Sequence, residues 1–146
     1  MKTNLNLNPW FVTTDFEPGL MNAALDIFPG VDLVPCFFHF AKCLWVNAAK
    51  CGLKRRFIVK DVKQLIFSLK ALCFRPPKLV MRWFESIKTY ESKGKNFTAF
   101  LEYFEHEWLD GVFKIKDWSY FDKIWEFDEL AITNNGLESF HQMIKS

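Results

Sequence analysis

The sequence predicts a mostly helical α+β domain, in which several helices pack on two short strands. The chain has 146 residues and half of them are hydrophobic, which suffices for one compact core. Two segments near the N-terminus are rich in β-branched and aromatic residues, and the apolar residues after them recur at helical spacing. Six glycines and six prolines exclude collagen-like and low-complexity classes.

The first 38 residues predict a strand, a helix and a second strand. Residues 9–14 combine aromatic and β-branched side chains and are predicted as a short buried strand. Residues 18–28 have helical spacing, and Pro29-Gly30 ends that helix. Residues 31–38 form the second candidate strand, which Pro35 makes brief or places near an edge. Two strands alone form a poor sheet, so other elements must cover them.

The rest of the chain predicts helices. Pro76-Pro77 and Asn96 mark the starts of two of them. Residues 110–116 are predicted as a linker, and residues 118–130 predict no definite state. Helices are expected over residues 39–52, 62–72, 77–87, 97–108 and 137–144.

Charge is segregated along the chain, although the net charge is only +2. Residues 42–95 contain fourteen Lys and Arg against three acids, and residues 102–129 contain nine acids against three lysines. This division favours a polyanionic partner, or two faces that neutralise each other. Ordinary solvated helix faces are the simpler explanation.

The chain shows no predicted membrane span or export signal. The longest apolar stretch, residues 33–49, is interrupted by His39 and Lys42 and is short for a span. The polar N-terminus does not resemble a signal peptide. We expect an intracellular protein, nuclear or cytoplasmic and not secreted, with no membrane partner. In such a compartment free thiols are expected at Cys36, Cys43, Cys51 and Cys73.

Asp15 ends the first predicted strand just as a helix begins. Strand ends are where sites collect in α/β proteins, so Asp15 is a candidate metal ligand. Thr14 and Glu17 also fit a capping box, and Asp15 itself fits an N-cap. The local pattern alone favours a cap.

Cys36 and His39 form a Cys-x-x-His pair, and Cys43 follows one helical turn later. These three side chains can meet a zinc ion, but a structural zinc site needs four ligands. Buried cysteines with a hydrogen-bonded histidine are the commoner outcome.

Residues 133–141 read Thr-Asn-Asn-Gly-Leu-Glu-Ser-Phe-His. Asn135 and Glu138 fit an N-cap with its third-position glutamate. Alternatively, Glu138 holds a divalent cation from the first turn of the last helix, with His141 on the same face.

Taken together, these groups follow one another in the same order as the motifs of a known family. The chain resembles the C-terminal part of the catalytic domain of Mutator-like element (MULE) transposases over about residues 10–144. The strand end at Thr14-Asp15, the Cys-x-x-His-Phe motif and the Thr-Asn-Asn-x-x-Glu-x-x-His box carry most of the resemblance. Further matching pieces are Phe28-Pro29, Leu44-Trp45, Gly52-Leu53 and Ile124-Trp125.

The resemblance implies the second half of an RNase H-like domain, with an all-helical insertion between the second and third catalytic acids. Residues 9–53 would be its strand and helix segment, residues 54–130 the insertion, and residues 131–146 the last helix with the glutamate box. The implied activity is cut-and-paste DNA transposition, and the implied partner is DNA carrying terminal inverted repeats.

The resemblance also assigns roles to residues. It implies that Asp15 and Glu138 are catalytic acids and ligands of Mg²⁺ or Mn²⁺, in a two-metal phosphoryl transfer. Auxiliary roles fall to Cys36, His39, Asn134, Asn135 and His141.

Three departures from the family pattern are evident. The first catalytic Asp belongs upstream of Asp15, and none of the fourteen residues before Asp15 is acidic. Residues 110–113, Asp-Gly-Val-Phe, are similar to the family's motif for the first catalytic Asp. They follow Asp15 in the sequence instead of preceding it, so we interpret the similarity as a coincidence. Ile132 occupies a place that is usually Arg, which removes a phosphate contact. We therefore expect a transposase remnant that is inactive alone.

Two non-catalytic functions are the alternatives. One is a helical protein-interaction domain, for which an exposed sheet edge predicts self-association. The other is DNA binding through a basic segment. Its candidate residues are Lys50, Lys54, Arg55, Arg56, Lys60 and Lys63.

Overall fold

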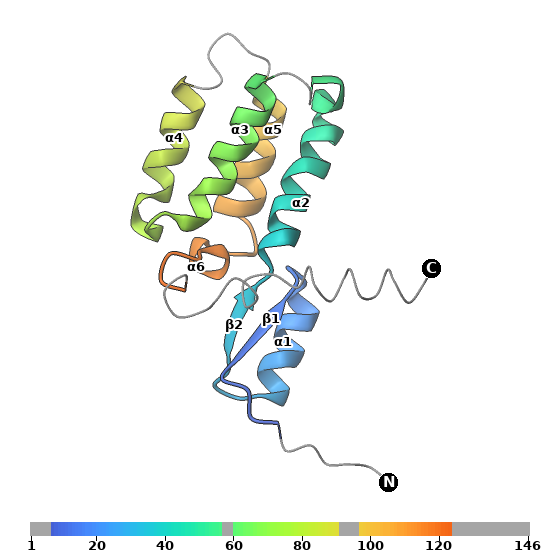
Figure 1. The fold of residues 1–146 in the computed structure, drawn as a ribbon, viewed down its shortest axis with the longest axis vertical. Helices are drawn as coiled ribbons and strands as arrows, with labels where there is room; N and C mark the ends of the chain where they lie inside the picture. Colours follow the sequence, from blue (N-terminus) through green and yellow to red (C-terminus); the bar gives the residue numbers. More distant parts are fainter. Residues whose placement is uncertain (1–6, 57–59, 91–96, 124–146) are drawn as a thin grey trace, which may run out of the picture.

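The computed structural model describes residues 7–56, 60–90 and 97–123. It begins with a β-α-β unit made of strand β1 (Phe11–Thr14), helix α1 (Pro18–Ile27) and strand β2 (Asp32–Pro35). The two strands are parallel, and their register runs from Phe11 opposite Asp32 to Thr14 opposite Pro35. Parallel strands need such a crossover connection, and α1 provides it beside β1 (Figure 1).

Local chemistry explains where these elements stop. Pro18 begins α1, where a missing amide hydrogen costs nothing. Gly30 has a φ of 84°, a left-handed conformation that suits glycine, and it turns the chain back toward β2. Pro35 is the last residue of β2, as expected for a residue that donates no ladder hydrogen bond.

Four helices continue from the β-α-β unit and lie side by side (Figure 1). They are α2 (Phe37–Ala48), α3 (Lys60–Ala71), α4 (Val80–Tyr90) and α5 (Thr98–Phe104). The segment Ala49–Leu53 continues from α2 as a π-helical turn with a kink at Gly52, whose φ is 82°, and another π-helical turn extends α5 through Glu105–Leu109. The short helix α6 (Ile115–Trp118) contacts β2 at the base of this bundle.

Aromatic side chains fill the space where the bundle meets the β-α-β unit. Trp118 is fully buried and stacks on Phe40 with ring centroids 5.5 Å apart. The indole of Trp108 contacts both rings edge-on, and the Trp118 Nε1 donates a hydrogen bond of 2.8 Å to the Trp108 carbonyl oxygen. This aromatic cluster of Phe40, Trp108 and Trp118 joins the start of α2 to the end of the described chain.

The predicted class, mostly helical with a small two-stranded sheet, is confirmed for the described residues. The prediction of a linker over residues 110–116 is partly wrong, because α6 begins at Ile115. The Lys114 amide donates to the Asp117 carboxylate at 2.8 Å, which stabilises this single turn. The expected last helix lies outside the part of the chain that the structure describes. Among the described helices, none is long and apolar enough to cross a membrane.

Candidate functional site

The candidate site lies at the carboxyl ends of the two parallel strands. Asp15 follows β1 directly, and Cys36 follows β2 directly. The Cys36 amide donates a hydrogen bond of 2.7 Å to the Thr14 carbonyl oxygen, which holds the two strand ends together. His39 stands in the first turn of α2, one turn after Cys36. Chain segments about twenty residues apart therefore converge at one point.

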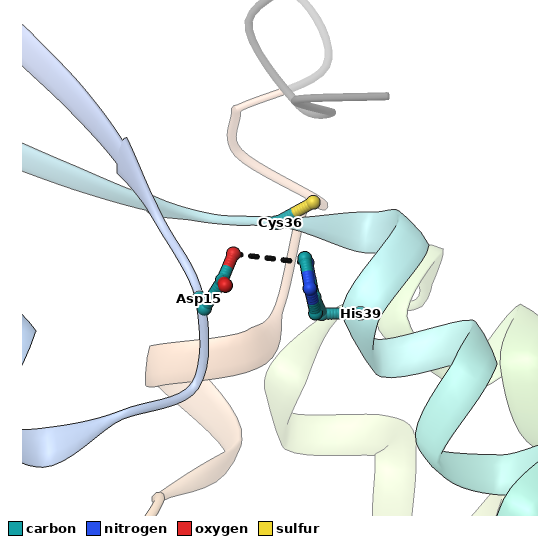
Figure 2. A group of neighbouring side chains, drawn as sticks. All are labelled: Asp15, Cys36 and His39. Atoms are coloured by element: carbon teal, nitrogen blue, oxygen red, sulfur yellow. Dashed lines mark ion pairs between the residues drawn. The ribbon is translucent and has the colours of Figure 1, made fainter. Parts of the chain in front are cut away.

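Asp15 and His39 face each other across this point (Figure 2). The His39 Nδ1 lies 2.9 Å from the Asp15 Oδ1. The Asp15 side chain is 38 % exposed and that of His39 is 21 % exposed, so water reaches both. When His39 is protonated, the contact is an ion pair, and at this exposure it contributes little to folding stability.

Cys36 completes a group of three donors. One ligand atom from each of Asp15, Cys36 and His39 lies within 4.8 Å of the others. The side chain of Cys36 is buried, whereas Asp15 and His39 line the more open side. The group offers a carboxylate oxygen, a thiol sulfur and an imidazole nitrogen, which are ligands for divalent metal ions.

An open pocket of about 400 Å³ adjoins the site along α2. Tyr103 anchors one wall, where its hydroxyl accepts hydrogen bonds from Asn47 Nδ2 at 3.0 Å and from Trp108 Nε1 at 3.1 Å. Burial raises the pKa of the Tyr103 phenol to about 12 and also raises the pKa of the Cys43 thiol. The pocket is lined by Phe16, Cys43, Asn47, Tyr103, Glu107, Trp108 and Phe113.

The structure brings together only some of the predicted site residues. Asp15, Cys36 and His39 converge. The resemblance implied only that Cys36 and His39 are an auxiliary pair and that Asp15 is a catalytic acid. Cys43, the third residue of the possible zinc group, is not part of the described cluster, and Asp15 takes its place. Residues Asn134, Asn135, Glu138 and His141 lie outside the described ranges, so the convergence of Asp15 with Glu138 stays a prediction.

The predicted basic residues lie far from this site. They surround the end of α2 that points away from the strands and the start of α3 (Figure 1). Eleven residues along the helix separate His39 from Lys50, the nearest of them in sequence, which corresponds to about 16 Å along the helix axis. The side chains of Lys50, Lys54, Arg55, Lys60 and Lys63 are exposed.

Arg56 differs from its neighbours because it is engaged within the fold. Its guanidinium lies 2.6 Å from the Asp61 carboxylate and 5.1 Å from the centre of the Phe97 ring. Arg56 therefore has a structural role that joins α3 to the start of α5. A DNA phosphate would have to compete with these contacts for its guanidinium.

Sequence reasoning missed the contact between Asp15 and His39. In the sequence each residue belongs to its own motif, Asp15 to a strand end and His39 to a Cys-x-x-His pair. The missing step is that the two strands are parallel, which places residues 15 and 36 at the same sheet edge.

Residues 110–113 have a structural explanation. The Asp110 amide donates to the Glu105 carbonyl oxygen at 3.0 Å. A Cβ atom at Gly111 would lie 2.2 Å from the Glu107 carbonyl oxygen. The backbone therefore requires glycine at this turn, independently of any similarity to the first-acid motif.

Comparison with known proteins adds no relative. No protein-family model, curated protein or solved structure matches this chain.

Proposed function

We propose that this chain carries the second and third acids of a Mutator-like DNA transposase catalytic domain. Asp15 is the second acid and Glu138 the third. The observation that supports this best is the position of Asp15. It stands at the carboxyl end of a parallel strand, 2.9 Å from the histidine of the Cys-x-x-His motif. A helical bundle then follows, in the order that the family resemblance implies.

The residues present fit a hard divalent cation only in part. Mg²⁺ takes oxygen ligands in near-octahedral geometry, and Mn²⁺ sites are also dominated by oxygen. The described site supplies one carboxylate, from Asp15, beside a nitrogen and a sulfur donor. Glu138 must supply the second carboxylate if Mg²⁺ or Mn²⁺ is to bind.

In this proposal the protein contributes position and charge. When bound, the cations activate a water or a 3′-hydroxyl and stabilise the leaving oxygen in phosphoryl transfer. Asp15 holds its carboxylate at a rigid strand end, and His39 orients that carboxylate through the Nδ1 contact. Two acids are fewer than the three of the family, so we expect no strand cleavage by this chain alone.

The direct test is Mn²⁺ binding by the full chain. Binding is measured as the loss of the electron paramagnetic resonance signal of free Mn²⁺. We expect binding by the wild type and its loss in both Asp15→Asn and Glu138→Gln. Asp26→Asn, which removes an exposed carboxylate of α1, is the matched control and should leave the affinity unchanged. Equal affinity in the wild type and Glu138→Gln would overturn the proposal.

A second candidate function is DNA binding through the basic end of the bundle. It is favoured by the five exposed basic side chains around the α2–α3 connection. Binding to duplex DNA should weaken steeply with salt, because each phosphate contact releases counterions. The double variant of Lys54→Ala with Arg55→Ala should lower the slope of log affinity against log salt by about 2.

A lysine elsewhere provides the control for this binding experiment. Lys116→Ala removes an exposed charge on α6, at the base of the bundle, and should leave the salt slope unchanged. If the double variant and the control bind DNA with the same slope, the basic end is not the contact surface.

A further inference from the structure

We propose that Asp15, Cys36 and His39 form a binding site for a zinc-type transition-metal ion, with one coordination position left open. This inference goes beyond the DNA-processing function and does not depend on Glu138. It shares Asp15 with the proposed Mg²⁺ or Mn²⁺ site, so the two kinds of ion would compete.

The separations between the donor atoms suit such an ion. Zinc bonds of about 2.0–2.3 Å place tetrahedral ligand atoms about 3.3–3.8 Å apart. The three donor atoms here lie within 4.8 Å of one another, and the Asp15–His39 pair is 2.9 Å apart. Adjustments of about 1 Å, within the reach of side-chain rotation, bring all three onto one tetrahedral face.

The kinds of donor select the class of metal. Thiolate and imidazole ligands favour zinc and similar ions, whereas Mg²⁺ prefers oxygen alone. Sites with three protein ligands keep the fourth position for water or substrate, as in catalytic zinc centres. The Asp15 and His39 side chains are partly exposed, so the site lies near the surface, although the Cys36 sulfur and the His39 Nδ1 atom are buried.

The backbone holds the ligands in place before any ion arrives. The hydrogen bond from the Cys36 amide to the Thr14 carbonyl oxygen fixes both strand ends. The Phe40 amide donates to the Cys36 carbonyl oxygen at 3.2 Å, which fixes the first turn of α2 and with it His39. Ligands supplied by a strand end and a helix turn are better positioned than ligands on loops.

Cobalt provides the test, because Co²⁺ occupies zinc sites and absorbs visible light. We expect the purified, reduced chain to bind one Co²⁺ per molecule, with strong d–d bands of tetrahedral geometry and a thiolate-to-cobalt charge-transfer band. Zn²⁺ should displace the cobalt and remove both signals, and binding should release the thiol proton.

Variants identify the ligands. Cys36→Ser should abolish the charge-transfer band, and Asp15→Asn and His39→Asn should each weaken Co²⁺ binding by more than about 100-fold, beyond the usual effect of an indirect contact. Cys43→Ser and Cys51→Ser remove half-buried thiols outside the cluster and are the matched controls. Asp26→Asn, which removes an exposed carboxylate of α1, should leave Co²⁺ affinity unchanged, and the thiolate band, which Mn²⁺ binding through carboxylates does not require, separates this test from the Mn²⁺ experiment.

Two outcomes would overturn the inference. One is a wild-type chain that binds no Co²⁺ or gives no thiolate band. The other is a thiolate band that survives Cys36→Ser but disappears in Cys43→Ser or Cys51→Ser. Because Cys36 is buried, circular dichroism must show that its variant is folded, and the more exposed Asp15→Asn variant decides the question if it is not.

Discussion

The hydroxyl of Tyr120 donates a hydrogen bond of 2.5 Å to the carbonyl oxygen of Pro35. The contact joins positions 85 residues apart, and both residues are buried. Pro35 is the last residue of β2 and precedes Cys36 directly. The Tyr120 amide also donates to the Cys73 carbonyl oxygen at 2.7 Å. Tyr120 therefore ties the base of the bundle to the strand end that carries the candidate metal site.

Removal of this hydroxyl should destabilise the fold. Tyr120→Phe leaves the buried Pro35 carbonyl oxygen without this donor, so we expect the free energy of unfolding to fall by about 1–3 kcal/mol. Urea denaturation followed by circular dichroism measures the change. Ser86→Ala, which removes an exposed helix hydroxyl, should stay within about 0.5 kcal/mol of the wild type. Equal losses in both variants would contradict a special role for Tyr120.

Stability should also decline in alkaline solution. Burial raises the pKa of Tyr103 to about 12 and raises that of Tyr120 as well, whereas an unfolded tyrosine titrates near 10. Above about pH 10 the unfolded chain has lost protons that the folded chain keeps, so unfolding becomes easier as the pH rises.

Denaturation at several pH values tests this dependence. A fully buried tyrosine contributes a slope of up to about 1.4 kcal/mol per pH unit above its unfolded pKa. The slope should be shallower in Tyr120→Phe. A free energy of unfolding that stays constant between about pH 9 and pH 11 would disprove the expectation.

Trp118 should be among the most costly side chains to truncate. It is fully buried in the aromatic cluster, so Trp118→Ala is expected to cost about 3–5 kcal/mol. Trp10→Ala makes the same chemical change at a side chain that is 77 % exposed and should cost well under 1 kcal/mol. Thermal or urea unfolding of the two variants gives the comparison, and similar losses would mean that the cluster is not central to the core.

Arg56 and Arg55 should behave differently although they are neighbours. Arg56→Ala loses the contacts with Asp61 and the Phe97 ring, and because the arginine is partly exposed we expect a loss of about 1 kcal/mol. Arg55→Ala removes an exposed side chain and should change stability by less than about 0.5 kcal/mol. Unfolding free energies at low and high salt distinguish them, since only the Arg56 effect should shrink with salt. An equal effect of both substitutions would contradict this assignment.

Asp15→Asn should leave the fold almost unchanged. The Asp15–His39 pair is partly exposed, so its loss should cost less than about 1 kcal/mol. The measurement is the urea midpoint of the metal-free chain in the presence of a chelator. A much larger loss would indicate that Asp15 serves the fold rather than a ligand.

The local elements were the part of the structure that the sequence could predict. Short-range patterns located both strands, α1 and the apolar faces of α2 to α5, because burial imposes the periodicity that the residues display. The expected second strand, residues 31–38, is too long at its end, because Phe37 and Phe38 already belong to α2. Helix α6 was missed because a single turn is too short to show a period, and it depends on the contact between Lys114 and Asp117.

Contacts between distant segments could not be predicted in the same way. Nothing near Arg56 indicates that Phe97 lies beneath its guanidinium, since that contact depends on how α5 packs. The cluster of Asp15, Cys36 and His39 depends on the pairing of two parallel strands, which is a property of the tertiary fold.

The aromatic cluster gives the protein an internal optical reporter. The Phe16 ring, on the residue next to Asp15, contacts the Trp108 indole edge-on at 5.0 Å, and Phe40 follows His39 directly in α2. Occupancy at the strand ends should therefore alter the fluorescence quantum yield and near-ultraviolet dichroism of these indoles. Ligand titrations can then be followed on the unlabelled chain, with no attached dye to disturb the equilibrium.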